Sequence, residues 1–277
     1  QRGVHHAYPR DGIDHDTCTA SIIYKPTHDY IENTIESIGA AFAYGATIVE
    51  IDVRPTKDHQ LVVFHNDDVS CRTDGSGYVW DSTLEQLRLL DLGYCYTYDG
   101  GKTYPYRGKA VGKISTLTEV LETFPGKRFL LDNKNLNDQS AVGLIVEVMA
   151  WVAACERARI YLRMPDKACA SVKKMLPDAK RLIEPRENQE KFFKEHIYSF
   201  GLWDLEGDYM DKGYAVPAFV KKYLVGWPYR FLRRAYDAGA RMYIFVHSKE
   251  ELDAISDIPF DGIVTYNIEE LGLNTTN

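Results

Sequence analysis

Residues 46–68 read ATIVEIDVRPTKDHQLVVFHNDD, and this stretch decides how the rest of the sequence is interpreted. Side chains of a strand alternate between its two faces, so Glu50 and Asp52 are expected on one face of an apolar strand. Burying paired carboxylates costs several kcal/mol unless a cation or hydrogen bonds compensate. After a turn-prone segment, a second apolar run ends on His65. The stretch therefore predicts a strand bearing two carboxylates, followed by a strand that ends on a histidine.

These residues alone leave two interpretations open. In the first, Glu50 and Asp52 are rim charges of a half-exposed strand, and His65 is a hydrogen-bonded histidine at a strand end. In the second, the three side chains belong to a functional site, because titratable groups with perturbed surroundings gather at such sites. The motifs in the rest of the chain favour the second interpretation.

Further motifs lie on both sides of this stretch. They are Glu32-Asn33-Thr34 before a helical pattern, Arg72-Thr73-x-Gly75-Ser76-Gly77 after His65, and Asp261-Gly262-Ile263-Val264-Thr265 near the end. Together with Glu50-x-Asp52 and His65, this order resembles the glycerophosphodiester phosphodiesterase family. The resemblance implies a TIM (β/α)8 barrel with loop insertions at its catalytic face. It also implies a metal-dependent phosphodiesterase that splits a small, polar, glycerophosphodiester-like substrate into a phosphomonoester and an alcohol.

The resemblance implies a metal site made of three carboxylates. Glu50 and Asp52 match two ligand positions, and Asp132, in the apolar run RFLLDNK at 128–134, stands where the family usually has a glutamate. Such oxygen ligands suit a hard divalent cation, Mg²⁺ or Ca²⁺. The alternative for Asp132 is a plain ion pair with Lys134.

The same resemblance assigns the phosphate and proton-transfer groups. Arg2 matches the family's phosphate-binding arginine and Lys134 its lysine, so both are expected to bind substrate, with Arg2 also serving catalysis. A surface salt bridge is the alternative for Arg2. His65 is the expected proton donor to the leaving group, or the base if the roles are reversed.

The start of the chain departs from the family pattern. Gln1-Arg2-Gly3 stands where the family has His-Arg-Gly, and glutamine cannot exchange a proton near neutral pH. His5, His6 and the late His247 are candidates to replace the missing histidine, although loop histidines are more often simply solvated. Two further functions therefore stay open. One is a degenerate barrel that binds phosphodiesters or sugar phosphates without turnover, and the other is a sphingomyelinase D-like enzyme that forms a cyclic phosphate.

Composition limits the class of protein. The chain has 277 residues, 45% of them hydrophobic, and a net charge of −7. This describes one soluble globular domain over residues 1–277 and gives no support for a nucleic-acid partner. It does not distinguish the cytoplasm from the periplasm. No apolar run is long enough to span a bilayer. The five cysteines form no C-x-x-C pair, so we expect reduced thiols or at most one or two bridges. Nothing indicates the oligomeric state.

Hydrophobic patterning predicts seven strands, and the family resemblance implies an eighth that would end at Gln1. The alternation of strands and helices alone would also permit an open doubly wound sheet. The predicted strands cover about 46–53, 60–65, 128–134, 159–163, 180–184, 241–246 and 262–265. The Gly- and Tyr-rich segment at about 66–113 is expected to be an insertion over the mouth of the active site, with scaffold packing as the alternative. Three further residues, Trp203, Tyr209 and Trp227, are expected either in a pocket wall or in the core, and Glu184 either beside the site or at the rim.

Overall fold

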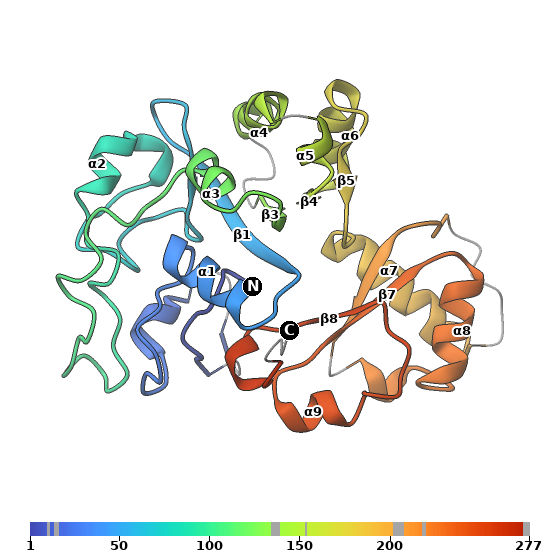
Figure 1. Cartoon of the computed structure of the whole chain (residues 1–277). Helices are drawn as coiled ribbons and strands as arrows, with labels where there is room; N and C mark the ends of the chain where they lie inside the picture. Colours follow the sequence, from blue (N-terminus) through green and yellow to red (C-terminus); the bar gives the residue numbers. More distant parts are fainter. Residues whose placement is uncertain are drawn as a thin grey trace.

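Parallel strands alternate with helices in the computed structural model, which describes residues 1–9, 12–13, 17–133, 139–152, 154–201, 208–217 and 220–273. One sheet contains β1 (Ile48–Pro55), β3 (Arg128–Asp132), β4 (Ile160–Arg163) and β5 (Lys180–Arg181), and a second contains β6 (Gly213–Val216), β7 (Arg241–Phe245) and β8 (Gly262–Val264). Within each sheet these strands are parallel and neighbours follow chain order. Figure 1 shows β1, β3 and β4 on one side of the molecule and β7 and β8 on the other.

Hydrogen bonds next to the strands connect the two sheets into a circle. The Glu184 N–H donates to Gly213 O at 2.8 Å, just beyond β5 and at the start of β6. On the other side, the Gln1 amine donates to Thr265 O at 2.9 Å, and the Arg2 N–H donates to Glu50 O at 2.7 Å. Residues 1–2 therefore occupy the position between β8 and β1. This is the strand order of the expected TIM (β/α)8 barrel.

Two of the strand predictions need correction. The run at 60–65 is not a barrel strand, because β2 (Leu61–Val63) pairs antiparallel with β1 through a hairpin. The short link from Asp52 to Leu61 already leaves no room for a crossover helix, which a parallel pairing would need. The strand that completes the series is β6, only four residues long, in a segment where the hydrophobic pattern predicts none.

The helices that follow the barrel strands cover its outside, and one short helix, α2 (Leu84–Arg88), lies in the insertion at 66–113. The helices are α1 (Ile35–Ala43), α2 (Leu84–Arg88), α3 (Leu117–Thr123), α4 (Gln139–Trp151), α5 (Ala154–Arg157), α6 (Asp166–Met175), α7 (Arg186–Tyr198), α8 (Tyr229–Asp237) and α9 (Lys249–Asp253). Thr34, Thr116 and Ser248 accept hydrogen bonds from the first turns of α1, α3 and α9, as N-cap residues do. In the described part of the chain, no helix is long and apolar enough to cross a membrane.

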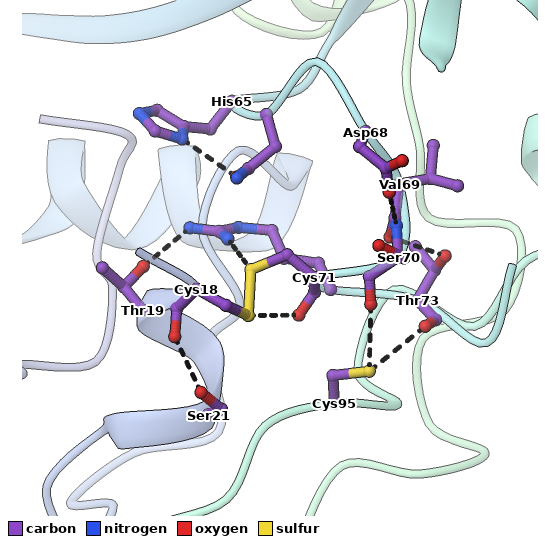
Figure 2. The surroundings of a disulfide bond; sticks show 12 residues. Cys18, Thr19, Ser21, His65, Asp68, Val69, Ser70, Cys71, Thr73 and Cys95 are labelled. Carbon is purple, nitrogen blue, oxygen red and sulfur yellow. Dashed lines mark hydrogen bonds between the residues drawn. A yellow bond between two sulfur atoms is a disulfide. The ribbon is translucent and has the colours of Figure 1, made fainter. Parts of the chain in front are cut away.

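The insertion at 66–113 has a small core of its own. Val69, Val79, Leu87, Tyr96 and Tyr106 are buried there in one cluster, which also takes in residues of the polar segment before α1 and of β2. A disulfide joins that preceding segment to the insertion, between Cys18 and Cys71 (Figure 2). The insertion is therefore packed and cross-linked, so scaffold packing explains much of this segment.

Candidate active site

Three carboxylates meet at the carboxyl ends of two adjacent strands. Glu50 and Asp52 lie on β1 and Asp132 on β3, and Asp52 and Asp132 are direct partners in the parallel register. One oxygen from each of the three lies within 4.8 Å of the others, and the residues are only 6%, 0% and 9% exposed. Three buried carboxylates so close together repel one another unless positive charge compensates. This set of hard oxygen donors can hold a divalent cation.

Arg2 contacts three groups of the site with one guanidinium. Its Nε lies 3.5 Å from the Asp52 carboxylate, one terminal nitrogen lies 3.3 Å from Glu32, and the other lies 2.5 Å from His65 Nε2. Burial opposes the charge on Arg2, but Glu32 and then Asp52 outweigh it and raise the pKa of the guanidinium further. The backbone of Arg2 has a φ of +57°, an unfavourable value for a residue with a side chain. The chain thus keeps a permanent positive charge beside the carboxylates.

His65 lies between Arg2 and Asn66. A guanidinium can only donate, so His65 Nε2 accepts from Arg2, which leaves the proton on Nδ1 to be donated to Asn66 Oδ1 at 3.0 Å. Arg54 fixes the backbone here, because its guanidinium donates to His65 O at 2.6 and 3.1 Å. The ring nitrogen that faces Arg2 is therefore Nε2, and it accepts the Arg2 hydrogen bond.

The motif Glu32-Asn33-Thr34 connects α1 to this site. Glu32 binds Arg2, while Asn33 donates its amide to Asp52 at 3.0 Å and accepts from the Asp52 N–H at 3.3 Å. Thr34 caps α1. These three consecutive residues are buried. Together they fix the position of Arg2, of the Asp52 carboxylate and of the first turn of α1.

Arg163 is a site residue that the sequence analysis missed. One of its terminal nitrogens lies 3.7 Å from the Asp132 carboxylate and 4.0 Å from that of Glu50. Burial opposes its charge, but the two carboxylates, Asp132 first, raise its pKa. Arg163 is the last residue of β4 and the direct partner of Asp132 in the sheet. A cation at the end of a barrel strand was the only signal that could have identified it.

The candidates to replace the missing histidine are placed differently. His5 and His6 are 1% and 4% exposed, and burial lowers the pKa of each to about 3. The His6 ring stacks on His28 and Tyr106, with centroids 4.5 and 4.8 Å away. Neither histidine is poised to exchange protons near neutral pH. His247 lies beside Tyr266, with ring centroids 5.6 Å apart.

The structure also places the remaining candidates. Gln1 lines a pocket of about 520 Å³ together with Glu50 and Arg163. Glu184 is buried, not at the rim, and its carboxylate accepts from Arg181 and Asn188.

Two of the aromatic candidates belong to the core. Tyr209 is buried in the core cluster beside β6 and β7, and Trp227 packs against the same cluster. Lys134 and Trp203 lie outside the described residues.

A second pocket connects His65 to the insertion. It has a volume of about 680 Å³, and its lining includes His65, the Cys18–Cys71 bridge, Tyr78 and Arg107. Arg107 stacks on Tyr104, with 3.4 Å between its guanidinium carbon and the ring centroid. Residues of the insertion therefore share a pocket with His65.

Comparison with known sequences identifies relatives of the chain. The model of the Glycerophosphoryl diester phosphodiesterase family matches residues 7–191. An uncharacterized protein of Mycobacterium tuberculosis is 31% identical over 146 residues, which are 52% of this chain and 48% of that protein. A glycerophosphodiester phosphodiesterase of Caldanaerobacter subterraneus is 40% identical over 101 residues, which are 36% of this chain and 38% of that protein. The chain thus spans about half or less of the length of these curated relatives.

Solved structures show the same fold. The glycerophosphoryl diester phosphodiesterase domain of the Mycobacterium tuberculosis protein matches with a TM-score of 0.67 and 19% identity, covering 87% of this chain and 93% of that one. An Oleispira antarctica phosphodiesterase, in complex with the product sn-glycerol-3-phosphate, matches with a TM-score of 0.60 and 22% identity, covering 87% and 90%. At these identities the likeness concerns the fold.

Proposed function

The chain belongs to the glycerophosphoryl diester phosphodiesterase family, and from that membership we propose that it hydrolyses a small, polar phosphodiester to a phosphomonoester and an alcohol. The observation that carries the proposal is the meeting of Glu50, Asp52 and Asp132 with Arg2. Fold alone would not suffice, because TIM barrels host many reactions. This site provides oxygen ligands for a cation and a permanent positive charge for a phosphate.

Each group has a defined part in the proposed reaction. A divalent cation, Mg²⁺ or Ca²⁺, held by the three carboxylates would neutralise charge on the nonbridging phosphate oxygens. Arg2 exchanges part of its present contacts for two phosphate oxygens, which its planar fork matches. Water forms a bond to phosphorus and releases one proton to solvent while the bond to the alcohol oxygen breaks. His65 Nε2, which has taken up a proton from solvent, gives that proton to the leaving alkoxide. Lys134 would add a second positive charge at the phosphate.

The substrate proposal is a glycerophosphodiester. The Oleispira relative was solved with sn-glycerol-3-phosphate as its product, and we infer that the phosphomonoester released by this chain is of the same class. The site has both features that such a product needs, a cation-binding carboxylate set and an arginine within 3.5 Å of one of its members. The alcohol on the other side of the phosphate varies among such substrates.

The experiment that tests this function measures alcohol release from glycerophosphodiesters with Mg²⁺, with Ca²⁺ or with EDTA. Glu50→Gln should lower turnover by about 10²-fold or more, because the phosphate charge loses its main compensation. The matched control is Glu122→Gln, since Glu122 is an exposed carboxylate of α3 away from the site. Turnover that persists in EDTA would refute the metal site. Binding of substrate with metal but without turnover would favour the binding-protein alternative.

A further inference from the structure

A fully buried arginine lies behind the phosphate-binding arginine. Arg72 is 1% exposed and places Nε 3.0 Å and a terminal nitrogen 2.9 Å from Glu32 Oε1. Glu32, itself 5% exposed, contacts Arg2 through the same oxygen at 3.3 Å. Two arginines therefore share one buried carboxylate, and Arg2 also reaches Asp52 and His65.

Charge fixes this arrangement. Burial alone would raise the pKa of Glu32, but Arg72 and then Arg2 lower it well below its usual range, so the carboxylate stays ionised. Arg72 makes the closer contacts and so supplies most of the compensation for the Glu32 charge. Without Arg72, that charge would act on Arg2 alone and draw its guanidinium away from the carboxylate site.

Covalent structure holds Arg72 in place. Cys18 and Cys71 form a disulfide, and the residues that follow them, Thr19 and Arg72, are joined by a 3.0 Å hydrogen bond from a guanidinium nitrogen to the threonine hydroxyl. Figure 2 shows the bridge with Thr19 beside it. The bridge links segments 53 residues apart, directly next to the arginine that binds Glu32.

We propose that Arg72 is a positioning residue for Arg2, acting through Glu32, and that the Cys18–Cys71 bridge keeps Arg72 in register with the site. The inference rests on the proposed function, because it assigns Arg2 to phosphate. Arg72 itself does not touch substrate in this scheme. Its effect is to hold the Arg2 fork toward Asp52 and His65, where a phosphate would be bound.

A double-mutant cycle separates positioning from general structural support. Calorimetry with glycerol 3-phosphate and with inorganic phosphate, in Mg²⁺ or Ca²⁺, compares the native chain with Arg72→Gln, Arg2→Gln and the double variant. Arg72→Gln should weaken binding by about tenfold when Arg2 is present and have little further effect when Arg2 is already replaced. Arg72→Lys, which keeps the charge, should restore part of the affinity. Additive losses would overturn the proposal, as would unchanged affinity in folded Arg72→Gln.

The bridge is tested with a matched cysteine control. The pair Cys18→Ser and Cys71→Ser removes the bridge, whereas Cys95→Ser removes a nearby thiol that donates to Thr73 O at 3.2 Å. The bridge variant should lose about tenfold in phosphate affinity and Cys95→Ser should lose none. Reducing the native protein with a phosphine allows the same comparison of phosphate affinity without mutation. A thiol count establishes that the bridge has been reduced. A phosphate affinity equal to that of the native chain in protein without the bridge would overturn the proposal that the bridge keeps Arg72 in register.

The two proposals fail in different ways. Phosphate affinity is measured without turnover, so a native chain that binds glycerol 3-phosphate but releases no alcohol would refute the proposed hydrolysis and still decide the role of Arg72. A native chain that hydrolyses substrate while the cycle is additive would refute the positioning role alone. A native chain that releases alcohol but binds neither phosphate ligand would overturn the role of Arg72 and leave the proposed hydrolysis standing.

Discussion

Lowering the pH from 7 to 5 should destabilise this protein through two buried histidines. His5 and His6 lie within the fold with pKa values lowered from 6.5 to about 3 by burial. Because the folded state holds these rings neutral, the unfolded chain binds more protons as the pH falls. The free energy of unfolding is therefore highest above pH 6.5, where both rings are neutral in the folded and the unfolded chain. It decreases progressively as the pH falls from 6.5 toward 3.

The size of the effect follows from the same shifts. At pH 5 an unfolded histidine is protonated with a gain of about 2 kcal/mol, since each unit below its ordinary pKa is worth about 1.4 kcal/mol. The folded state gains almost nothing at that pH. Two such rings together lower the free energy of unfolding by about 4 kcal/mol, a large part of the 5–15 kcal/mol typical of a domain.

Urea unfolding at pH 7, 6 and 5 measures this loss. His6→Phe keeps an aromatic ring against Tyr106 and His28 but cannot titrate. Between pH 7 and pH 5 its free energy of unfolding should therefore fall by about 2 kcal/mol less than that of the native chain. His59→Asn is the control for replacing a histidine as such, since His59 lies exposed in the turn between β1 and β2. Equal pH slopes for His6→Phe and the native chain would refute the reasoning and return His6 to the list of proton-transfer candidates.

Two other predictions concern the candidate site. Gln1→His should raise turnover by about 10²–10⁴-fold, the usual size of an acid–base contribution, as measured by alcohol release; no gain would show that position 1 is not where the second proton transfer occurs. Arg163→Gln should tighten metal binding by about tenfold, because a positive charge about 4 Å from two carboxylates competes with the cation. Thermal shift against metal concentration measures this, with the exposed Arg186→Gln as control, and weaker binding would contradict it.

The local signals in the sequence were sufficient for the carboxylate strand and for the capped helices. Alternation placed Glu50 and Asp52 on one strand, and β1 is found at Ile48–Pro55 against an expected 46–53. The helical pattern that follows Glu32-Asn33-Thr34 is found as α1, with Thr34 as its N-cap. These features depend on neighbours a few residues apart, which a sequence shows directly.

Long-range pairing could not be predicted in the same way. Arg163 reaches Asp132 only because β4 pairs with β3 in one register, and a strand pattern does not specify which residues become partners. The Cys18–Cys71 bridge likewise follows from how the insertion folds back onto the segment before α1, and five cysteines allow many pairings. The strand β6 was missed because Gly213-Tyr214-Ala215-Val216 is buried at every position and shows no alternation, in a segment of weak hydrophobic patterning.

The contacts made by the motif at residues 32–34 could not be predicted from the sequence, although the motif itself could be found there. In the sequence, Thr34 indicates the start of a helix, and Glu32 and Asn33 are two polar residues that precede it. In the fold, the same turn fixes Arg2 through Glu32 and Asp52 through Asn33, while Thr34 sets the position of α1. A shift of this helix start would therefore move Arg2 and Asp52 together, the arginine that we propose for the phosphate and a carboxylate that we propose for the metal.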